Sequence, residues 1–145
     1  MENKNLYIVV EGESDKKVLR KILDFSKVGK VFMYVTMSKN TISSYARTLR
    51  LMYNDNPKIL VIFDSDVIDK TKAREDVETM RQLSGATTSR NVGFFAFVPD
   101  MDTHLSIEKK ILRNDDKLDA YLNENLDRLK AEKIIKEIQA FIDKE

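Results

Sequence analysis

The sequence contains no cysteine and no tryptophan, and it has only four glycines and two prolines in 145 residues. The lack of cysteine excludes disulfide bonds, a thiolate nucleophile and a cysteine-ligated zinc site. No segment approaches the roughly 20 consecutive apolar residues that a membrane-spanning helix needs. The first residues, MENKNLYIVV, also lack the long apolar core and the cleavage site of a signal peptide, so we expect a cytoplasmic protein.

Acidic and basic residues are nearly balanced, and the formal net charge is +1. This balance excludes a protein that coats nucleic acid by charge alone. Residues 1–63 carry 11 Lys and Arg against 6 Asp and Glu, whereas residues 64–145 carry 14 against 18. A chain of this length is expected to form one domain. An acidic site and a basic surface can therefore lie within the same domain.

Two hydrophobic periods alternate along the first two thirds of the chain. Residues 6–10, 31–35, 59–63 and 92–98 form short apolar runs that are typical of strands buried on both faces. Between them, residues 15–25, 41–53 and 70–83 carry apolar side chains at helical spacing. Strands that alternate with helices in this way predict right-handed βαβ units and a parallel sheet.

From about residue 102 the pattern is helical. Leu105, Ile111 and Leu112 mark one short helix, and residues 118–141 mark a longer helical region with room for one break. We therefore predict an α/β fold: a Rossmann-like parallel four-stranded sheet sandwiched by helices, with a helical C-terminal extension. The α/β domain is expected over residues 1–112. Residues 113–145 would pack on that domain or form an interface with a second copy or a partner.

Acidic residues follow three of the four expected strands. They are Glu11 and Glu13 after the first strand, Asp64, Asp66 and Asp69 after the third, and Asp100 and Asp102 after the fourth. For the strand order 2-1-3-4 these three strands are neighbours, and ligands bind at the carboxyl ends of such a sheet. Carboxylates held together repel one another unless a cation intervenes, and Mg²⁺ suits an oxygen site that leaves room for phosphate and water.

Helix capping is the alternative interpretation of several of these acids. Glu13, Ser14 or Asp15 could cap the first helix, Asp69 the third, and Asp102 or Thr103 the fourth. Capping explains the pair Asp64 and Asp66 less well, because one cap needs only one acid.

Two segments resemble the motifs of TOPRIM domains. LYIVVEGESD at residues 6–15 is similar to the first motif, a hydrophobic strand that ends in Glu-Gly, and ILVIFDSD at residues 59–66 is similar to the second, a strand that ends in Asp-x-Asp. The resemblance covers roughly residues 5–110. It implies that Glu11 is the general acid/base or a carboxylate close to the metal, and that Asp64 and Asp66 hold Mg²⁺ or Mn²⁺.

Within that family the chain looks most like the small stand-alone and OLD-type nuclease branch. In OLD-type nucleases an additional acid beyond the fourth strand serves a second metal, and Glu108 is the candidate for that role here. The chain has no Walker-type phosphate loop. An ATPase would therefore be a separate partner.

Other residues have two interpretations each. His104 and Glu108 have i, i+4 spacing and could bind a metal from one helix. Lys16, Lys17, Arg20 and Lys39 could contact phosphates of a nucleic acid, or could simply lie on solvated helix faces. The apolar residues near the C-terminus could pack on the domain or form a homodimer contact.

The leading hypothesis is Mg²⁺-dependent phosphodiester hydrolysis of DNA or RNA, with Glu11, Asp64 and Asp66 as the catalytic residues. The second is a non-catalytic TOPRIM module that binds nucleic acid or a protein partner. The third is a phosphatase of the haloacid-dehalogenase class, in which the first residue of an Asp-x-Asp motif is the nucleophile. That class does not account for the strand that ends at Glu11.

Overall fold

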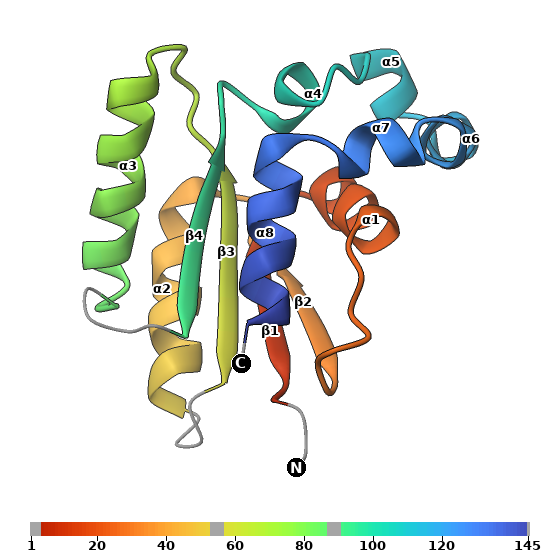
Figure 1. The fold of residues 1–145 in the computed structure, drawn as a ribbon. Coiled ribbons are helices and arrows are strands. Elements are labelled where there is room, and N and C mark those ends of the chain that lie inside the picture. Colours follow the sequence, from red (N-terminus) through yellow and green to blue (C-terminus); the bar gives the residue numbers. More distant parts are fainter. Residues whose placement is uncertain (1–3, 53–56, 87–90, 145) are drawn as a thin grey trace.

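A single parallel sheet forms the centre of the molecule. The computed structural model describes residues 4–52, 57–86 and 91–144 (Figure 1). The strands are β1 (Leu6–Val10), β2 (Val31–Val35), β3 (Lys58–Asp64) and β4 (Val92–Phe97). Their order is β2-β1-β3-β4, and every neighbouring pair is parallel. The predicted fold class and strand order are confirmed.

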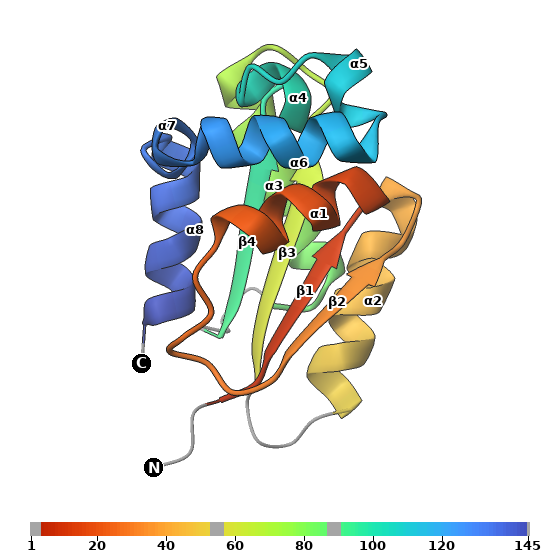
Figure 2. The ribbon, with the colours of Figure 1, turned by 90° about the vertical axis from the view of Figure 1, so that its right-hand side faces the viewer.

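Helices cover both faces of this sheet. Helices α1 (Glu13–Ile22) and α8 (Lys133–Asp143) lie on one face, and α2 (Lys39–Met52) and α3 (Lys70–Leu83) lie on the other (Figures 1 and 2). All five residues of β1 are buried, as are the first six of β3. These two central strands therefore separate two hydrophobic clusters, one beneath each pair of helices.

The helix boundaries differ from the sequence pattern mainly at α1. This helix begins two residues before the predicted start and ends at Ile22, because Leu23 adopts an extended conformation with φ −82° and ψ 145°. Helix α2 also begins two residues early, and its predicted last residue, Tyr53, lies outside the described residues. Helix α3 has the predicted bounds.

The C-terminal region contains more breaks than its apolar pattern suggests. After α4 (Met101–His104) and α5 (Lys109–Leu112), the predicted long helical region consists of α6 (Asp115–Glu124), α7 (Leu126–Lys130) and α8. The break at Asn125 has φ −111° and ψ 14°, which interrupts the helical geometry. Among the helices of the described residues, none is long and apolar enough to cross a membrane.

Helices α6 to α8 bury their apolar side chains in the same cluster as the sheet and α1. Buried residues of this cluster include Leu6, Ile8, Leu60, Leu118, Leu122, Leu129, Ile135 and Ile138. Figure 2 shows α6 crossing beside α1 at the carboxyl end of the sheet. The C-terminal helices thus complete the core on the α1 face.

Close packing and a buried lysine hold α8 against the strands. A Cβ atom at Gly93 of β4 would lie only 2.9 Å from two ring carbons of Phe141. At the same C-terminal end of the helix, the ammonium group of Lys58 donates hydrogen bonds to the carbonyl oxygens of Ile142 (2.6 Å) and Lys144. These carbonyls belong to the end of a helix, where no backbone donor remains for them.

Candidate functional site

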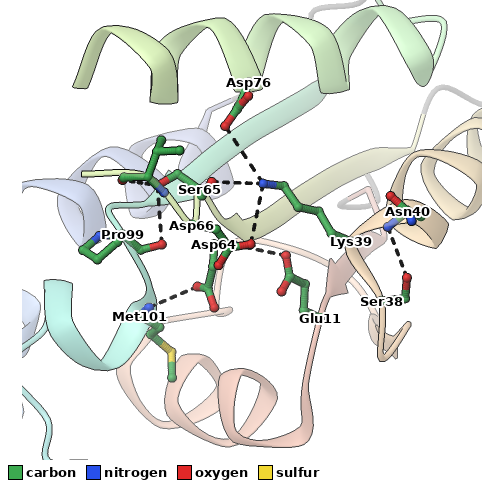
Figure 3. A network of polar contacts seen from close by, with 11 residues as sticks. Glu11, Ser38, Lys39, Asn40, Asp64, Ser65, Asp66, Asp76, Pro99 and Met101 are labelled. Atoms are coloured by element: carbon green, nitrogen blue, oxygen red, sulfur yellow. Dashed lines mark hydrogen bonds and ion pairs between the residues drawn. The ribbon is translucent and has the colours of Figure 1, made fainter. Parts of the chain in front are cut away.

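The acidic residues that follow the strands meet at the carboxyl edge of the sheet. Glu11 directly follows β1, Asp64 is the last residue of β3, and Asp100 lies beyond β4, immediately before α4. Because β1, β3 and β4 are adjacent, their ends form one continuous edge. Figure 3 shows Glu11, Asp64 and Asp66 gathered there.

Two backbone hydrogen bonds fix the orientation of the central carboxylates. Glu11 Oε1 accepts a hydrogen bond from the backbone N–H of Asp64 at 3.3 Å, and Asp64 Oδ1 accepts one from the N–H of Met101 at 3.0 Å (Figure 3). The first TOPRIM-like motif is therefore bonded directly to the second. The N–H of Met101, the first residue of α4, adds a third segment to this series of hydrogen bonds.

The loop after β3 turns sharply at Asp66. This residue has a positive φ of 61°, a conformation that residues other than glycine adopt infrequently. The turn is held in place because the N–H of Asp66 donates to the carbonyl of Pro99 at 2.8 Å and the buried Ser65 donates to the carbonyl of Phe97 at 2.9 Å. The two loops that carry Asp64, Asp66 and Asp100 are thus joined by backbone bonds.

A second residue with positive φ lies beside Glu11. Met37 follows β2 with φ 62°, and its N–H donates to the carbonyl of Glu11 at 2.7 Å. Its side chain is 76% exposed, which is unusual for a large apolar residue. Strained conformations of this kind cluster at functional sites.

Lys39, a candidate for either a phosphate contact or a solvated helix face, lies among the carboxylates. Its ammonium group donates to the carbonyl of Ser65 at 3.1 Å and lies 3.9 Å from Asp66 and 4.0 Å from Asp76 of α3 (Figure 3). It also lies 5.4 Å from the ring centroid of Phe63. One side chain at the start of α2 thereby ties α2, α3 and the Asp66 loop together.

Asp15 joins this group from the first turn of α1. Its carboxylate accepts a hydrogen bond from the N–H of Gly12 at 3.1 Å, and Gly12 is the N-cap of the helix. From the sequence, Asp15 is expected only as a helix cap or as part of the TOPRIM-like motif. Its position four residues after Glu11, in the first turn of the following helix, is the signal that places it at the same edge.

Burial and mutual repulsion raise the pKa values of these carboxylates. Burial, followed by the charges of Asp15 and Glu11, raises the pKa of Asp64 to about 8. Burial also raises the pKa of Asp15 to about 6, and Asp102 adds to the effect. The pKa of Glu11 is raised by burial and by the charges of Asp66 and Asp15. At neutral pH and without a cation, the group therefore holds at least one proton.

Asp100 and Asp102 form a pair at the start of α4. Burial and a hydrogen bond shared with Asp100 raise the pKa of Asp102. Partial burial acts in the same direction on Asp100, but hydrogen bonds from the side chain and backbone of Thr103 outweigh it and lower the pKa of Asp100. The pair thus extends the acidic edge beyond Asp64.

The capping interpretation is confirmed at α3 and is wrong at α4 and at α1, whose N-cap is Gly12 and not Glu13, Ser14 or Asp15. Asp69 caps α3, because its Oδ1 accepts a hydrogen bond from the N–H of Thr71 at 2.8 Å. Helix α4 is capped by Asp100, whose Oδ1 accepts from the N–H of Thr103 at 2.9 Å. The expected caps, Asp102 and Thr103, lie inside that helix.

His104 and Glu108 do not share a helix, so the predicted i, i+4 arrangement is wrong. Helix α4 ends at His104, and Glu108 is the N-cap of α5. His104 Nδ1 accepts a hydrogen bond from the N–H of Val98 at 2.9 Å, and burial lowers the pKa of this histidine. Glu108 forms an exposed ion pair with Lys110, Nζ to Oε2 3.2 Å. The largest charge effects on Asp64 come from Asp15, Glu11 and Asp100 instead.

The basic residues of α1 lie on the opposite side of the helix from its buried face, next to acidic α6. Lys17 forms an ion pair with Asp115, and Asp119 also acts on its charge. Arg20 is exposed and Lys16 is partly exposed. The charge of this proposed phosphate-binding face is thus partly neutralised by the chain itself.

The donor set suits a hard divalent cation, although the ligands are not gathered into a complete shell. Within the residues that the structure describes, no three acidic or histidine side chains lie close enough together to hold a metal ion. Glu11 and Asp64 each use one carboxylate oxygen for a backbone hydrogen bond. The second carboxylate oxygen of each residue can serve as a metal ligand. Mg²⁺ needs only one or two carboxylates when water and phosphate complete its coordination shell.

Comparison with known proteins gives no functional assignment. No protein-family model matches the sequence, and no curated protein or solved structure matches it. The geometry at the carboxyl edge of the sheet is therefore the basis for any functional conclusion.

Proposed function

We propose that the protein is a Mg²⁺- or Mn²⁺-dependent phosphodiesterase that hydrolyses nucleic acid, either DNA or RNA. The observation that carries this proposal is the contact between Glu11 and Asp64 at the edge where three strand ends meet. Asp64 has a pKa of about 8 there, so its charged form is unfavourable until a cation is present. A site built in this way gains from binding a divalent ion.

Asp64 and Asp66 are the residues that would hold the ion, with Glu11 next to it. When bound, a divalent ion screens the charge of a scissile phosphate and lowers the pKa of a coordinated water. Asp64 ends β3 and Asp66 lies in the loop that follows, and the backbone bonds of Ser65 to Phe97 and of Asp66 to Pro99 hold this loop against the end of β4. The site is thus positioned before any ligand binds, as electrostatic catalysis requires.

Glu11 is the candidate general acid or base. Its pKa is raised, so it can take up and release a proton closer to neutral pH than an exposed glutamate can. The hydrogen bond from the N–H of Asp64 orients its carboxylate. Lys39 counteracts part of the acidic charge, and its bond to the carbonyl of Ser65 steadies the turn that carries Asp66.

The TOPRIM-like motifs support the same assignment, because both end at this edge. A second copy of the chain or a separate ATPase would be its protein partner. Glu108 would serve a second ion only if its ion pair with Lys110 were exchanged for that role.

A metal titration combined with a nuclease assay tests this proposal. Wild type should bind Mg²⁺ or Mn²⁺ and cleave single-stranded, duplex or structured oligonucleotides, whereas Asp64→Asn should lose both properties and Glu11→Gln should lose cleavage. Asp69→Asn is the matched control, because asparagine also caps helices and should leave α3 and the activity intact. Full cleavage by Asp64→Asn would overturn the assignment.

A second candidate is a module that binds nucleic acid without cleaving it. The observation in its favour is that no three ligand side chains converge within the described part of the chain. This candidate predicts binding that is independent of metal and unaffected by Asp66→Ala. The two candidates are separated by repeating the metal titration with an oligonucleotide present, since substrate phosphate can complete the shell of the ion.

A further inference from the structure

A groove runs along the outer edge of β4, between α3 and α8. Its volume is about 700 Å³, which lies within the range of cavities that bind small molecules. Its lining includes Phe94 and Ala96 of the strand and Pro99 beyond it. In Figure 1, β4 is the last strand of the sheet on this side, with α3 on one flank and α8 on the other.

The floor of the groove offers backbone groups that have no partner among the described residues. Carbonyls of β4 that face β3 belong to alternate residues, as shown by the bonds from Ile59 N to Asn91 O and from Ser65 N to Phe97 O. The peptide N–H and C=O groups of Phe94 and Ala96 therefore point to the other side, where no strand follows within the described part of the chain. A ligand in the groove can form hydrogen bonds with them.

The walls carry three cations and one anion. Lys70 and Arg74 line the groove from successive turns of α3, and Lys133 and Glu137 line it from α8. Among the described residues, neither Lys70, Arg74 nor Lys133 forms an ion pair. This arrangement contrasts with Lys17, whose charge is paired with Asp115. The groove therefore has an uncompensated positive charge that suits an anionic ligand.

His104 adds a neutral hydrogen-bond donor to the same groove. Because its Nδ1 accepts the hydrogen bond from Val98, the neutral ring carries its proton on Nε2. Burial and the nearby charge of Lys70 lower the pKa of this histidine. Thr103, which also lines the groove, supplies a hydroxyl group beside it.

One end of the groove adjoins the acidic edge of the sheet. Pro99 lines the groove, and its carbonyl accepts the hydrogen bond from the N–H of Asp66. Ile68, which is 84% exposed, and Lys70 line the groove from the chain that follows Asp66. The same two loops thus form the end of the groove and hold the carboxylates.

We infer that this groove binds the phosphodiester backbone of a single-stranded nucleic acid and leads it to the carboxylates at the ends of β1 and β3. The inference rests on the proposed function and specifies its substrate. The groove has a volume that suits a ligand of one or two nucleotides, which favours a single strand over a duplex. Lys70, Arg74 and Lys133 contact the phosphates, and the outward-facing peptide groups of β4 face the bases.

Fluorescence anisotropy with labelled oligothymidylate and oligouridylate tests the inference. The measurements are made in EDTA, so that cleavage does not interfere, and at several salt concentrations. Arg74→Ala and Lys133→Ala should each weaken binding about threefold to tenfold and lower the slope of log affinity against log salt by about 0.7, the value for one lost phosphate contact on a single strand. The matched controls are Lys72→Ala on α3 and Lys136→Ala on α8, two exposed lysines that do not line this groove.

Equal affinities and equal salt slopes for the groove variants and the controls would overturn the inference. Displacement of the oligonucleotide by an acidic peptide such as oligoglutamate at equal affinity would also overturn it, because the groove would then recognise protein chains. The proposed function is tested separately by Asp64→Asn. If that variant loses metal binding and cleavage while Arg74→Ala binds normally, only the groove inference fails. If Arg74→Ala loses binding while Asp64→Asn still cleaves, only the proposed catalytic site fails.

Discussion

The carboxylate of Glu11 accepts a hydrogen bond from the backbone N–H of Asp64, across 53 positions of sequence and between two adjacent strands. Because the donor is a backbone group, any residue except proline at position 64 leaves it in place. The orientation of Glu11 can therefore be separated experimentally from the charge of Asp64.

Asp64→Asn should stabilise the protein at alkaline pH. Asparagine keeps an oxygen that can accept the hydrogen bond from Met101 but cannot ionise. In the wild type, the pKa of Asp64 rises from 3.8 in the unfolded chain to about 8 in the fold, so the folded state binds more protons between these values. Stability contributed by this group is thus complete below about pH 4 and decreases as the pH rises towards 8.

Denaturant unfolding at pH 5 and pH 8 measures this effect. With allowance for the partial exposure of Asp64, we expect the variant to gain on the order of 1 kcal/mol relative to wild type at pH 8 and much less at pH 5. The same pH dependence in both proteins would contradict the assigned burial of this charge.

Divalent metal should reverse that destabilisation in the wild type. A ligand that binds only the folded state adds RT ln(1 + [L]/Kd), so 10 mM Mg²⁺ at a Kd of about 1 mM adds about 1.4 kcal/mol. Asp64→Asn should show no such gain. Unfolding in Mg²⁺ and in NaCl of equal ionic strength distinguishes specific binding from screening, and an equal gain in both salts would exclude a site.

Replacing Lys39 by methionine should raise the pKa of Glu11 further. The ammonium group is among the charges that lower this pKa, and it also holds the carbonyl of Ser65. NMR titration of the Glu11 side-chain carbon measures the change directly. Lys39→Arg keeps the charge and should leave the pKa close to its wild-type value, so an equal rise in both variants would show that geometry and not charge controls Glu11.

The contact between Gly93 and Phe141 should make Gly93→Ala destabilising. The new methyl group would lie 2.9 Å from the ring, which must move within a packed interface. We expect a loss of about 1–3 kcal/mol in the free energy of unfolding. Phe141→Leu in the same chain should restore part of that loss, and a double-mutant cycle measures the coupling. Additive effects would mean that the two positions do not contact each other.

The sheet and the meeting of Glu11 with Asp64 were predictable because both follow from buried apolar strands. Once β1 and β3 are parallel neighbours, residues that end them must lie at one edge, whatever the loops do. The positive φ of Asp66 and the position of Lys39 were not predictable, since they depend on bonds to Pro99 and Ser65 from distant segments.

The breaks between the C-terminal helices and the position of the groove could not be predicted from the sequence either. Leu118, Leu122 and Leu129 keep a helical period through the break at Asn125, so periodicity alone did not reveal the separate helices. Lys70 and Lys133 are 63 positions apart, and only the packing of α3 and α8 on either side of β4 brings them into one groove. In the sequence, the pattern of these unpaired basic residues is the same as that of any solvent-exposed helix face.

The position of α8 affects how the protein folds during its synthesis. Helices α2 and α3 precede β4 in the chain, so their face of the sheet can be covered as soon as that strand is made. The other face includes Leu6, Ile8 and Leu60, and it is not fully covered until Ile135 and Ile138 of α8 have been synthesised. About 35 residues separate Phe97 from Lys133, which takes about 2 to 7 s at 5–20 residues per second. During that interval the nascent chain presents a half-covered sheet, and a chaperone that binds apolar strands would find its target on the α1 face.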